Sequence, residues 1–358
     1  MKKLISLVLA LLMCTSLLVG CSSSKPDTSK TEPKPAAETN AVSPSAAMLQ
    51  EIDKTLMAQL APLPEKGKNE KIGVLIISLT NPFWANMKTC YEQAAKDLGI
   101  TVEVLTGTTE GDTTSQLETL MTMATKKYDA IIISPINGTN LIPGIIQCNQ
   151  NKIKVINLGP GVDTKALEAA GGHLDGKITV MFDDQGRLCA EDMIKRLKDG
   201  GKVAILQGLA GAAQSEGRTA GAKKVFESAK DIKVVAVQPC DWDATQAYDA
   251  TKAIVQANPD LKGIFACNDV MALAAVKALK AEGKSGVLVY GVDFTADAQA
   301  SIKAKEMMGS MTYSSAIYTK AAELYALKLV QGQTVKGPIY SPITLVTQDN
   351  IAKFDDWK

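Results

Sequence analysis

Aromatic, amide and carboxylate side chains stand directly after several short apolar segments of this 358-residue chain. Aromatic rings present flat apolar faces to C–H surfaces, and amide and carboxylate oxygens accept hydrogen bonds from hydroxyl groups. This combination is typical of a site for a sugar or a similar polyhydroxylated small molecule. The six residues at these positions are Asn81, Phe83, Trp84, Trp242, Asn268 and Asp293.

Some of these side chains also suit a purely structural role. Asn81 suits a turn before Pro82. One of Phe83 and Trp84 is expected in the core beneath the helix they begin, because adjacent helical residues face different ways. Trp242 stands among polar residues on an expected loop, so a role in a site is favoured for it.

Two of the polar positions precede helices, where short polar side chains serve as caps. We expect Asp269 to cap the helix that begins near Val270, which leaves Asn268 free to contact a ligand. Asp293 could cap a helix that begins near Thr295, but ligand contact is the favoured interpretation.

From residue 71 the chain alternates short apolar runs, typical of buried strands, with helical patterns. Two consecutive βαβαβα runs predict an α/β fold of two doubly wound lobes with parallel sheets. In such sheets a ligand binds beyond the carboxyl ends of the strands, where the six residues fall. Strands are expected at 72–78, 102–105, 130–134, 154–158, 202–207, 233–238, 263–267 and 287–292, and helices at 82–98, 113–127, 141–149, 184–197, 217–230, 245–257, 270–282 and 296–305.

The composition argues for binding rather than catalysis. The 39 Lys and Arg residues balance 38 Asp and Glu residues, so the basic excess of a nucleic-acid-binding protein is absent. A single histidine, His173, disfavours histidine-rich metal sites and Ser–His–Asp catalysis. We therefore expect no enzyme activity, no cofactor, no metal and no nucleic-acid partner.

The first residues indicate export. Lys2 and Lys3 precede an apolar run that is short for a bilayer span and suits a signal peptide over residues 1–20. The run ends in Leu-Val-Gly-Cys (residues 18–21), which resembles a bacterial lipobox. Cys21 is therefore expected to carry a lipid that anchors the protein to the outer face of the cell membrane. An ordinary secretory signal with a chance cysteine is the alternative.

Residues 21–70 are expected to form a lipidated flexible tether, because the first half holds few large apolar side chains. Within this segment, residues 46–63 predict a short amphipathic helix, which either packs on the folded body or continues the tether. The five cysteines beyond residue 21 are odd in number and lack CxxC spacing. We expect no disulfide, with Cys189 and Cys240 as the weak alternative pair.

Several short motifs together resemble the type I periplasmic sugar-binding proteins of ABC importers, nearest the ribose-binding proteins. The resemblance covers residues 71–350. It implies two lobes joined by three hinge strands, which close on the ligand, and delivery of that ligand to a membrane permease. The motifs are Asn-Pro-Phe-Trp (81–84), Leu-Gln-Gly-Leu-Ala-Gly (206–211), Gln-Pro (238–239), Phe-Ala-Cys-Asn-Asp (265–269) with Met-Ala-Leu (271–273), and Gly-Val-Asp (291–293).

The resemblance assigns roles to eight positions. Tyr313 stands where ribose-binding proteins carry a glutamine near the hinge, so it would contribute a ring face or a phenol. Arg218 matches a family Arg-x-x-Gly motif that is mainly structural, so it is the weakest of the eight candidates for ligand contact. The rings that would sandwich the sugar are Phe83, Trp84 and Trp242. The polar groups that would bond its hydroxyls are Asn81, Asn268 and Asp293.

Two positions depart from the family pattern. Sugar-binding relatives commonly carry an Asp-Arg pair where this chain has Gly-Pro (159–160), and a second ligand arginine where it has Glu216. Each lost guanidinium removes charge-assisted hydrogen bonds of about 1.5–3 kcal/mol. Either Asp183, Asp184 or Gln214 substitutes for them, or the ligand is not a ribose-like pentose.

The resemblance also predicts the partners of the protein and the boundaries of its two lobes. It implies a monomer whose partners are a small-molecule ligand and ABC permease subunits. A sensory protein of the same fold, which would present its ligand to a membrane receptor or histidine kinase, is the alternative. The expected N-terminal lobe comprises 71–175 with 314–343, and the C-terminal lobe comprises 176–313 with 344–358.

Overall fold

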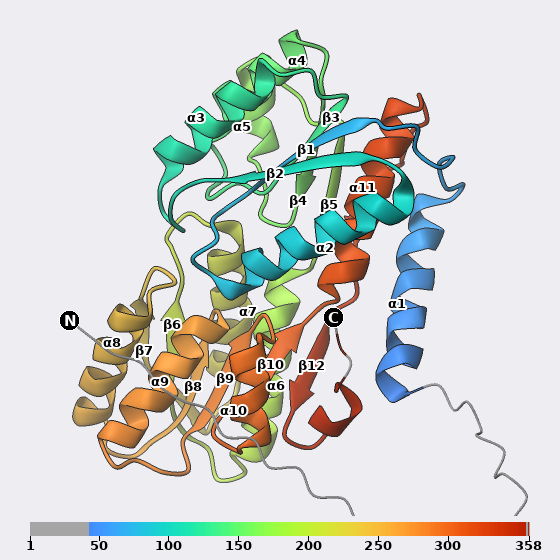
Figure 1. The fold of residues 1–358 in the computed structure, drawn as a ribbon. Coiled ribbons are helices and arrows are strands. Elements are labelled where there is room, and N and C mark those ends of the chain that lie inside the picture. The colour runs from blue at the N-terminus through green and yellow to red at the C-terminus, as the bar shows by residue number, and fades with distance from the viewer. Residues whose placement is uncertain (1–42, 356, 358) are drawn as a thin grey trace, which may run out of the picture. The chain divides into compact units, whose positions relative to one another are not determined.

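Continuous aliphatic runs form the central strands of two sheets in the computed structural model, which describes residues 43–355 and 357 (Figure 1). The predicted signal peptide and Cys21 lie outside the described residues. The first sheet has the order β11-β5-β4-β3-β1-β2, and all of its neighbouring strands are parallel. Its strands are β1 (Lys71–Ile76), β2 (Thr101–Thr106), β3 (Ala130–Ile133), β4 (Lys154–Leu158), β5 (Gly176–Thr179) and β11 (Ile339–Tyr340).

The second sheet has the order β12-β10-β9-β8-β6-β7. Its neighbouring strands are parallel except at one edge, where β12 pairs antiparallel with β10. Two doubly wound lobes are therefore confirmed, with this one antiparallel edge added. The strands are β6 (Gly201–Gln207), β7 (Ile232–Pro239), β8 (Leu261–Ala266), β9 (Leu288–Val292), β10 (Gly309–Thr312) and β12 (Thr344–Thr347).

Helices cover both faces of each sheet, as buried parallel strands require (Figure 1). In β1, Val74 packs in one apolar cluster with Met87 of α2, whereas Leu75 packs in another with Leu120 of α3, because successive strand residues face opposite sides. The helices are α1 (Pro44–Leu60), α2 (Pro82–Leu98), α3 (Thr113–Ala124), α4 (Ile142–Gln150), α5 (Thr164–Ala169), α6 (Phe182–Arg196), α7 (Ala213–Ser228), α8 (Ala244–Ala257), α9 (Asp269–Ala281), α10 (Ala296–Lys303) and α11 (Ser315–Val330), with a short 3₁₀ helix at Ile351–Lys353.

The chain passes between the two sheets at three points. These are residues 180–181 after β5, residues 313–314 after β10, and residues 341–343 after β11. Because β5 pairs with β4, the first sheet extends to Thr179, four residues beyond the boundary expected at 175.

Helix α1 packs on the first lobe beside α11 (Figure 1). Of the two alternatives that its sequence left open, it therefore packs on the folded body. Its buried face includes Ile52, Leu56 and Leu60. The Gln59 side-chain amide exchanges two 3.0 Å hydrogen bonds with the backbone of Tyr340 in the edge strand β11. The amide thereby satisfies peptide groups that an edge strand otherwise leaves unpaired.

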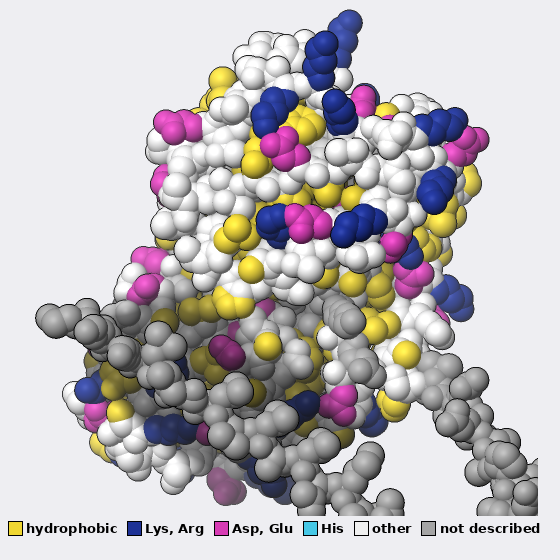
Figure 2. All heavy atoms as spheres, viewed as in Figure 1, with side chains coloured by type: hydrophobic (Ala, Val, Ile, Leu, Met, Phe, Trp, Pro, Cys, Tyr) yellow, Lys and Arg dark blue, Asp and Glu magenta, His cyan; other side chains and the backbone are white. Residues whose placement is uncertain are grey.

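Charged side chains of both signs share the surface, and the buried cysteines are unpaired. On the face drawn in Figure 2, basic and acidic side chains of the described residues are interspersed rather than gathered by sign. Cys148, Cys189, Cys240 and Cys267 are buried free thiols, so Cys189 and Cys240 form no disulfide. Within residues 43–355, no helix is long and apolar enough to span a bilayer.

Candidate ligand-binding site

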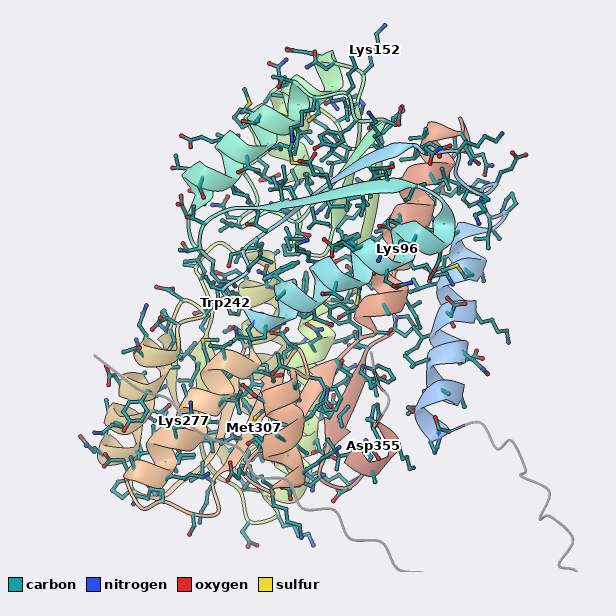
Figure 3. The ribbon with its side chains drawn as sticks, viewed as in Figure 1. Lys96, Lys152, Trp242, Lys277, Met307 and Asp355 are labelled. Atoms are coloured by element: carbon teal, nitrogen blue, oxygen red, sulfur yellow. The ribbon has the colours of Figure 1, made fainter. Side chains whose placement is uncertain are left out.

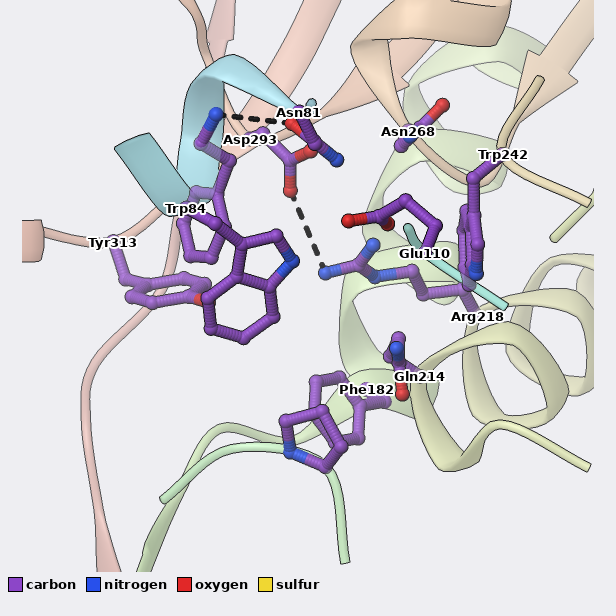
Figure 4. A pocket seen from close by; sticks show the side chains of 12 residues that line it. Asn81, Trp84, Glu110, Phe182, Gln214, Arg218, Trp242, Asn268, Asp293 and Tyr313 are labelled. Carbon is purple, nitrogen blue, oxygen red and sulfur yellow. Dashed lines mark hydrogen bonds and ion pairs between the residues drawn. The ribbon is translucent and has the colours of Figure 1, made fainter. Parts of the chain in front are cut away.

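One cavity, about 360 Å³ with its open mouth included, has walls from both lobes (Figure 4). The structure brings all eight predicted site residues to its wall. The cavity is lined by Asn81, Phe83, Trp84, Glu110, Pro160, Phe182, Gln214, Arg218, Trp242, Asn268, Asp293 and Tyr313.

The beginning of α2 supplies three of these side chains. Asn81 caps the helix, since its Oδ1 accepts a 2.9 Å hydrogen bond from the Phe83 N–H. Both Phe83 and Trp84 line the cavity, and both also belong to the buried apolar cluster beneath α2. Their ring centroids lie 5.0 Å apart in an edge-to-face arrangement, and the Tyr313 ring extends the series 5.8 Å beyond Phe83.

Arg218 of α7 is held in place by the second lobe. Its Nε donates to Gln185 Oε1 at 2.8 Å, and its Nη1 donates to the Cys267 carbonyl at 2.7 Å. Its Nη2 lies 3.7 Å from Asp293 Oδ1, with both side chains buried. The structural role expected for this arginine is therefore present, and its guanidinium also borders the cavity.

Two site residues adopt backbone conformations that L-residues rarely take. Trp242 has a φ of 67° and Asp293 a φ of 114°, so their loops hold these side chains in otherwise costly geometry. Figure 3 labels Trp242 near the boundary between the lobes. Its ring lies against Gly208, where an added Cβ would stand 2.1–2.3 Å from three ring carbons.

The prediction that Asp269, rather than Asn268, caps α9 is wrong. Asn268 is the N-cap of α9, since its Oδ1 accepts from the Met271 N–H at 2.9 Å. Its Nδ2 is buried without a partner among the described residues. Asp269 instead accepts from the Ser310 hydroxyl and from the Thr295 N–H, both at 2.7 Å. One amide thus caps the helix and still offers a donor to the cavity.

Asp293 caps no helix, because Thr295 is the N-cap of α10. The structure also decides among the groups proposed to replace the missing arginines. Gln214 lines the cavity with an unpartnered, buried Oε1, whereas Asp183 and Asp184 do not line it. Glu216 is exposed and caps the loop by accepting from the Gly211 N–H.

Three further lining residues were missed by the sequence reasoning. Glu110 follows β2, so the rule that polar residues at strand ends form the site would have found it. Phe182 begins α6 immediately after a chain crossing, and no local signal marks it. Pro160 was noted only as a departure from the family pattern, although it lines the cavity.

Burial is the largest cause of the raised pKa values of three acidic groups at or near the cavity. It raises the pKa of Asp293 to about 7, although Arg218 opposes the change. Burial and the neighbouring Asp293 raise the pKa of Asp269 to about 8. Burial also raises the pKa of Glu110 to about 7, and hydrogen bonds from Asn81 and Ser78 oppose it.

These groups show no arrangement for catalysis or metal binding. Within the described part of the chain, no three His, Cys, Asp or Glu residues come together to hold a metal ion. Rings, amides and carboxyl groups around a cavity can instead stack on and hydrogen-bond a small polar molecule.

The fold and the cavity together are those of a two-lobed substrate-binding protein. The chain belongs to the family described as the periplasmic binding protein domain, whose family model matches residues 72–334. This is a family of non-enzymatic, extracytoplasmic components of ABC importers, so the absence of enzyme activity expected from composition agrees with the family.

Similar proteins bind sugars. The D-allose-binding periplasmic protein of Escherichia coli is 36% identical over 245 residues, which cover 68% of this chain and 79% of that protein. The D-ribose/D-allose-binding protein of Pseudomonas aeruginosa is 31% identical over 304 residues, covering 82% and 92%. A solved solute-binding protein from Actinobacillus succinogenes, with bound D-allose, matches with a TM-score of 0.76 at 32% identity, covering 79% of this chain and 99% of that one.

Proposed function

We propose that this protein captures a sugar or a sugar-like polyhydroxylated molecule between its lobes and delivers it to an ABC importer. The observation that carries the proposal is the cavity, where rings lie beside buried amides whose polar atoms have no partner among the described residues. A sugar would cover the rings with its C–H faces and satisfy the amides with its hydroxyls. The similar proteins also bind sugars.

The mechanism that we propose is closure of the two lobes on the ligand. Asn81 and Trp84 belong to the first lobe, whereas Trp242 and Asn268 belong to the second, so a ligand in the cavity contacts both. The three crossings are the segments about which the lobes would rotate. Closure is favoured only by contacts that the closed state makes and the open state lacks.

The cavity favours a ligand other than ribose. Gly-Pro at 159–160 and the exposed Glu216 leave Arg218 as the single guanidinium at the cavity wall, and Gln214 is the replacement group. An amide is a weaker partner for hydroxyls than a guanidinium. Tight and selective binding of D-ribose in calorimetry would contradict this inference.

A thermal-shift panel of aldoses, ketoses, polyols, nucleosides and amino acids tests the proposal on the intact chain. A ligand at a hundred times its Kd adds about 2.7 kcal/mol of stability and raises the Tm by several degrees. A response to sugars supports the proposal. A response only to nucleosides or amino acids would reassign the ligand.

Two substitutions test the site assignment. Trp242→Ala and Asn81→Ala should each weaken binding of the best sugar by roughly tenfold or more, the effect of one lost buried contact. Tyr248→Ala removes a partly buried ring of α8 outside this cavity and serves as the control. Unchanged affinity in both site variants would refute the assignment.

We further propose that Cys21 carries a lipid anchor and that the folded body acts as a monomer. The support is the sequence of residues 1–21. Cys21→Ala should move the protein from the membrane fraction to the soluble fraction of cells. The sensory alternative is not favoured, because the similar proteins are components of importers.

A further inference from the structure

The charges at the cavity wall do not balance. Asp293 pairs with Arg218 at 3.7 Å, and Arg218 is the single basic side chain among the residues that line the cavity. Glu110 also lines it, and the Ser78 hydroxyl lies 3.4 Å from its carboxylate. No basic nitrogen in the described part of the chain lies within 4.0 Å of that carboxylate.

Arg218 forms an ion pair with Asp293 and none with Glu110 among the described residues. Its Nε and Nη1 are already committed to Gln185 and to the Cys267 carbonyl, which fix the guanidinium against the second lobe. Glu110 enters the cavity from the β2–α3 loop of the first lobe (Figure 4). One negative charge is therefore left over where the two lobes meet.

A partly buried carboxylate without a cation is costly, and the described residues place no cation beside Glu110. The cost shows in the pKa of Glu110, which burial raises to about 7. A positively charged ligand would pair with Glu110 and so remove this free-energy cost.

The rest of the wall suits a positively charged ligand that also carries hydroxyl groups. The faces of Trp84 and Trp242 attract cations as well as C–H groups. Two buried amide atoms at the wall have no partner among the described residues: Nδ2 of Asn268, a residue 1% exposed, and Oε1 of Gln214, a residue 8% exposed. A quaternary ammonium ion could not donate to Gln214 or accept from Asn268, whereas hydroxyl groups can do both.

We propose that the ligand is an amino sugar, whose protonated amine pairs with Glu110 while its hydroxyls satisfy Asn268 and Gln214. The inference rests on the proposed function, since it names the sugar class for the same cavity. The neutral parent sugar would leave the Glu110 charge unpaired.

Calorimetry of the intact chain at pH 7 tests the inference with matched pairs: D-glucosamine against D-glucose, and D-galactosamine against D-galactose, with D-allose and choline alongside. At least one amino sugar should bind ten or more times tighter than its neutral parent. Glu110→Gln should reduce that ratio to about one. Glu118→Gln, an exposed change on α3, should leave the ratio unchanged.

Each other outcome has a distinct meaning. Binding of neutral sugars without any preference for their amino counterparts overturns the inference and leaves the proposed function intact. A preference that survives in Glu110→Gln refutes the role of that residue. Tighter binding of choline, a cation with a single hydroxyl group, than of every sugar overturns the amino sugar as the ligand. Absence of binding throughout the panel argues against the proposed function itself.

Discussion

A single methyl group at Gly208 should disable the cavity by displacing a ring. The Cβ of an alanine there would stand 2.1 Å from Cη2 of Trp242 and 2.3 Å from Cζ2 and Cζ3. Contacts under about 3 Å are not found in real proteins, so the ring must move by roughly an ångström. The φ of Gly208 lies outside the left-handed region, so alanine meets no backbone penalty.

The displaced ring moves towards the ligand, because Gly208 and the cavity both border it. Trp242 is 7% exposed, so it has little free space into which it can retreat. Loss of one stacked ring face is worth about 1–3 kcal/mol. The Kd for the sugar that binds best in the thermal-shift panel should therefore rise about fivefold to 150-fold in Gly208→Ala.

Calorimetry of four proteins tests this reasoning: the parent, Gly208→Ala, Trp242→Ala and the double variant. Once the large ring is gone, the added methyl should have no further effect, so the two substitutions should be strongly non-additive. Gly138→Ala is the control, since its Cβ would meet its nearest atoms at an ordinary 3.5 Å. Full additivity, or parental affinity in Gly208→Ala, would refute the mechanism.

Two further predictions concern stability. Burial raises the pKa of Glu323 to about 9, and its carboxylate has no hydrogen-bond partner among the described residues. The folded state thus holds a proton that the unfolded state has lost, so stability falls as pH rises from about 4.5 to 9, by at most about 1.4 kcal/mol per pH unit. Glu323→Gln should stabilise the protein in chemical denaturation at pH 8 more than at pH 5, unlike Glu118→Gln; equal effects at both pH values would contradict this. Leu56 is fully buried in α1, so Leu56→Ala should cost about 2–5 kcal/mol locally. Hydrogen exchange should then accelerate in α1 but not in the second sheet, and the exposed Thr55→Ala should show no such change.

Much of the fold could be predicted because local sequence patterns mark where its strands and helices begin and end. The apolar run of β1, the proline that opens α2 and the glycine that ends it predict a strand and a helix without tertiary information. Strand ends then point to the site, since parallel strands share one carboxyl edge. That rule, together with the family resemblance, located all eight predicted residues.

The roles of individual polar groups were harder to predict. Asn268 and Asp269 are adjacent, and both suit a helix cap. Asp269 was excluded from that role by Ser310, which lies 41 residues away and holds its carboxylate at 2.7 Å. A partner so distant in sequence leaves no local signal.

The sequence by itself determined the two-lobed α/β class, the polar and aromatic side chains at the strand ends, and the family. These follow from periodicity and residue type, which are local properties. Only the tertiary structure decided that Glu110, Phe182 and Gln214 join the cavity and that α1 packs beside α11. The unpaired carboxylate of Glu110 is likewise visible only in the tertiary structure. It depends on which side chains the two lobes bring within a few ångströms of each other.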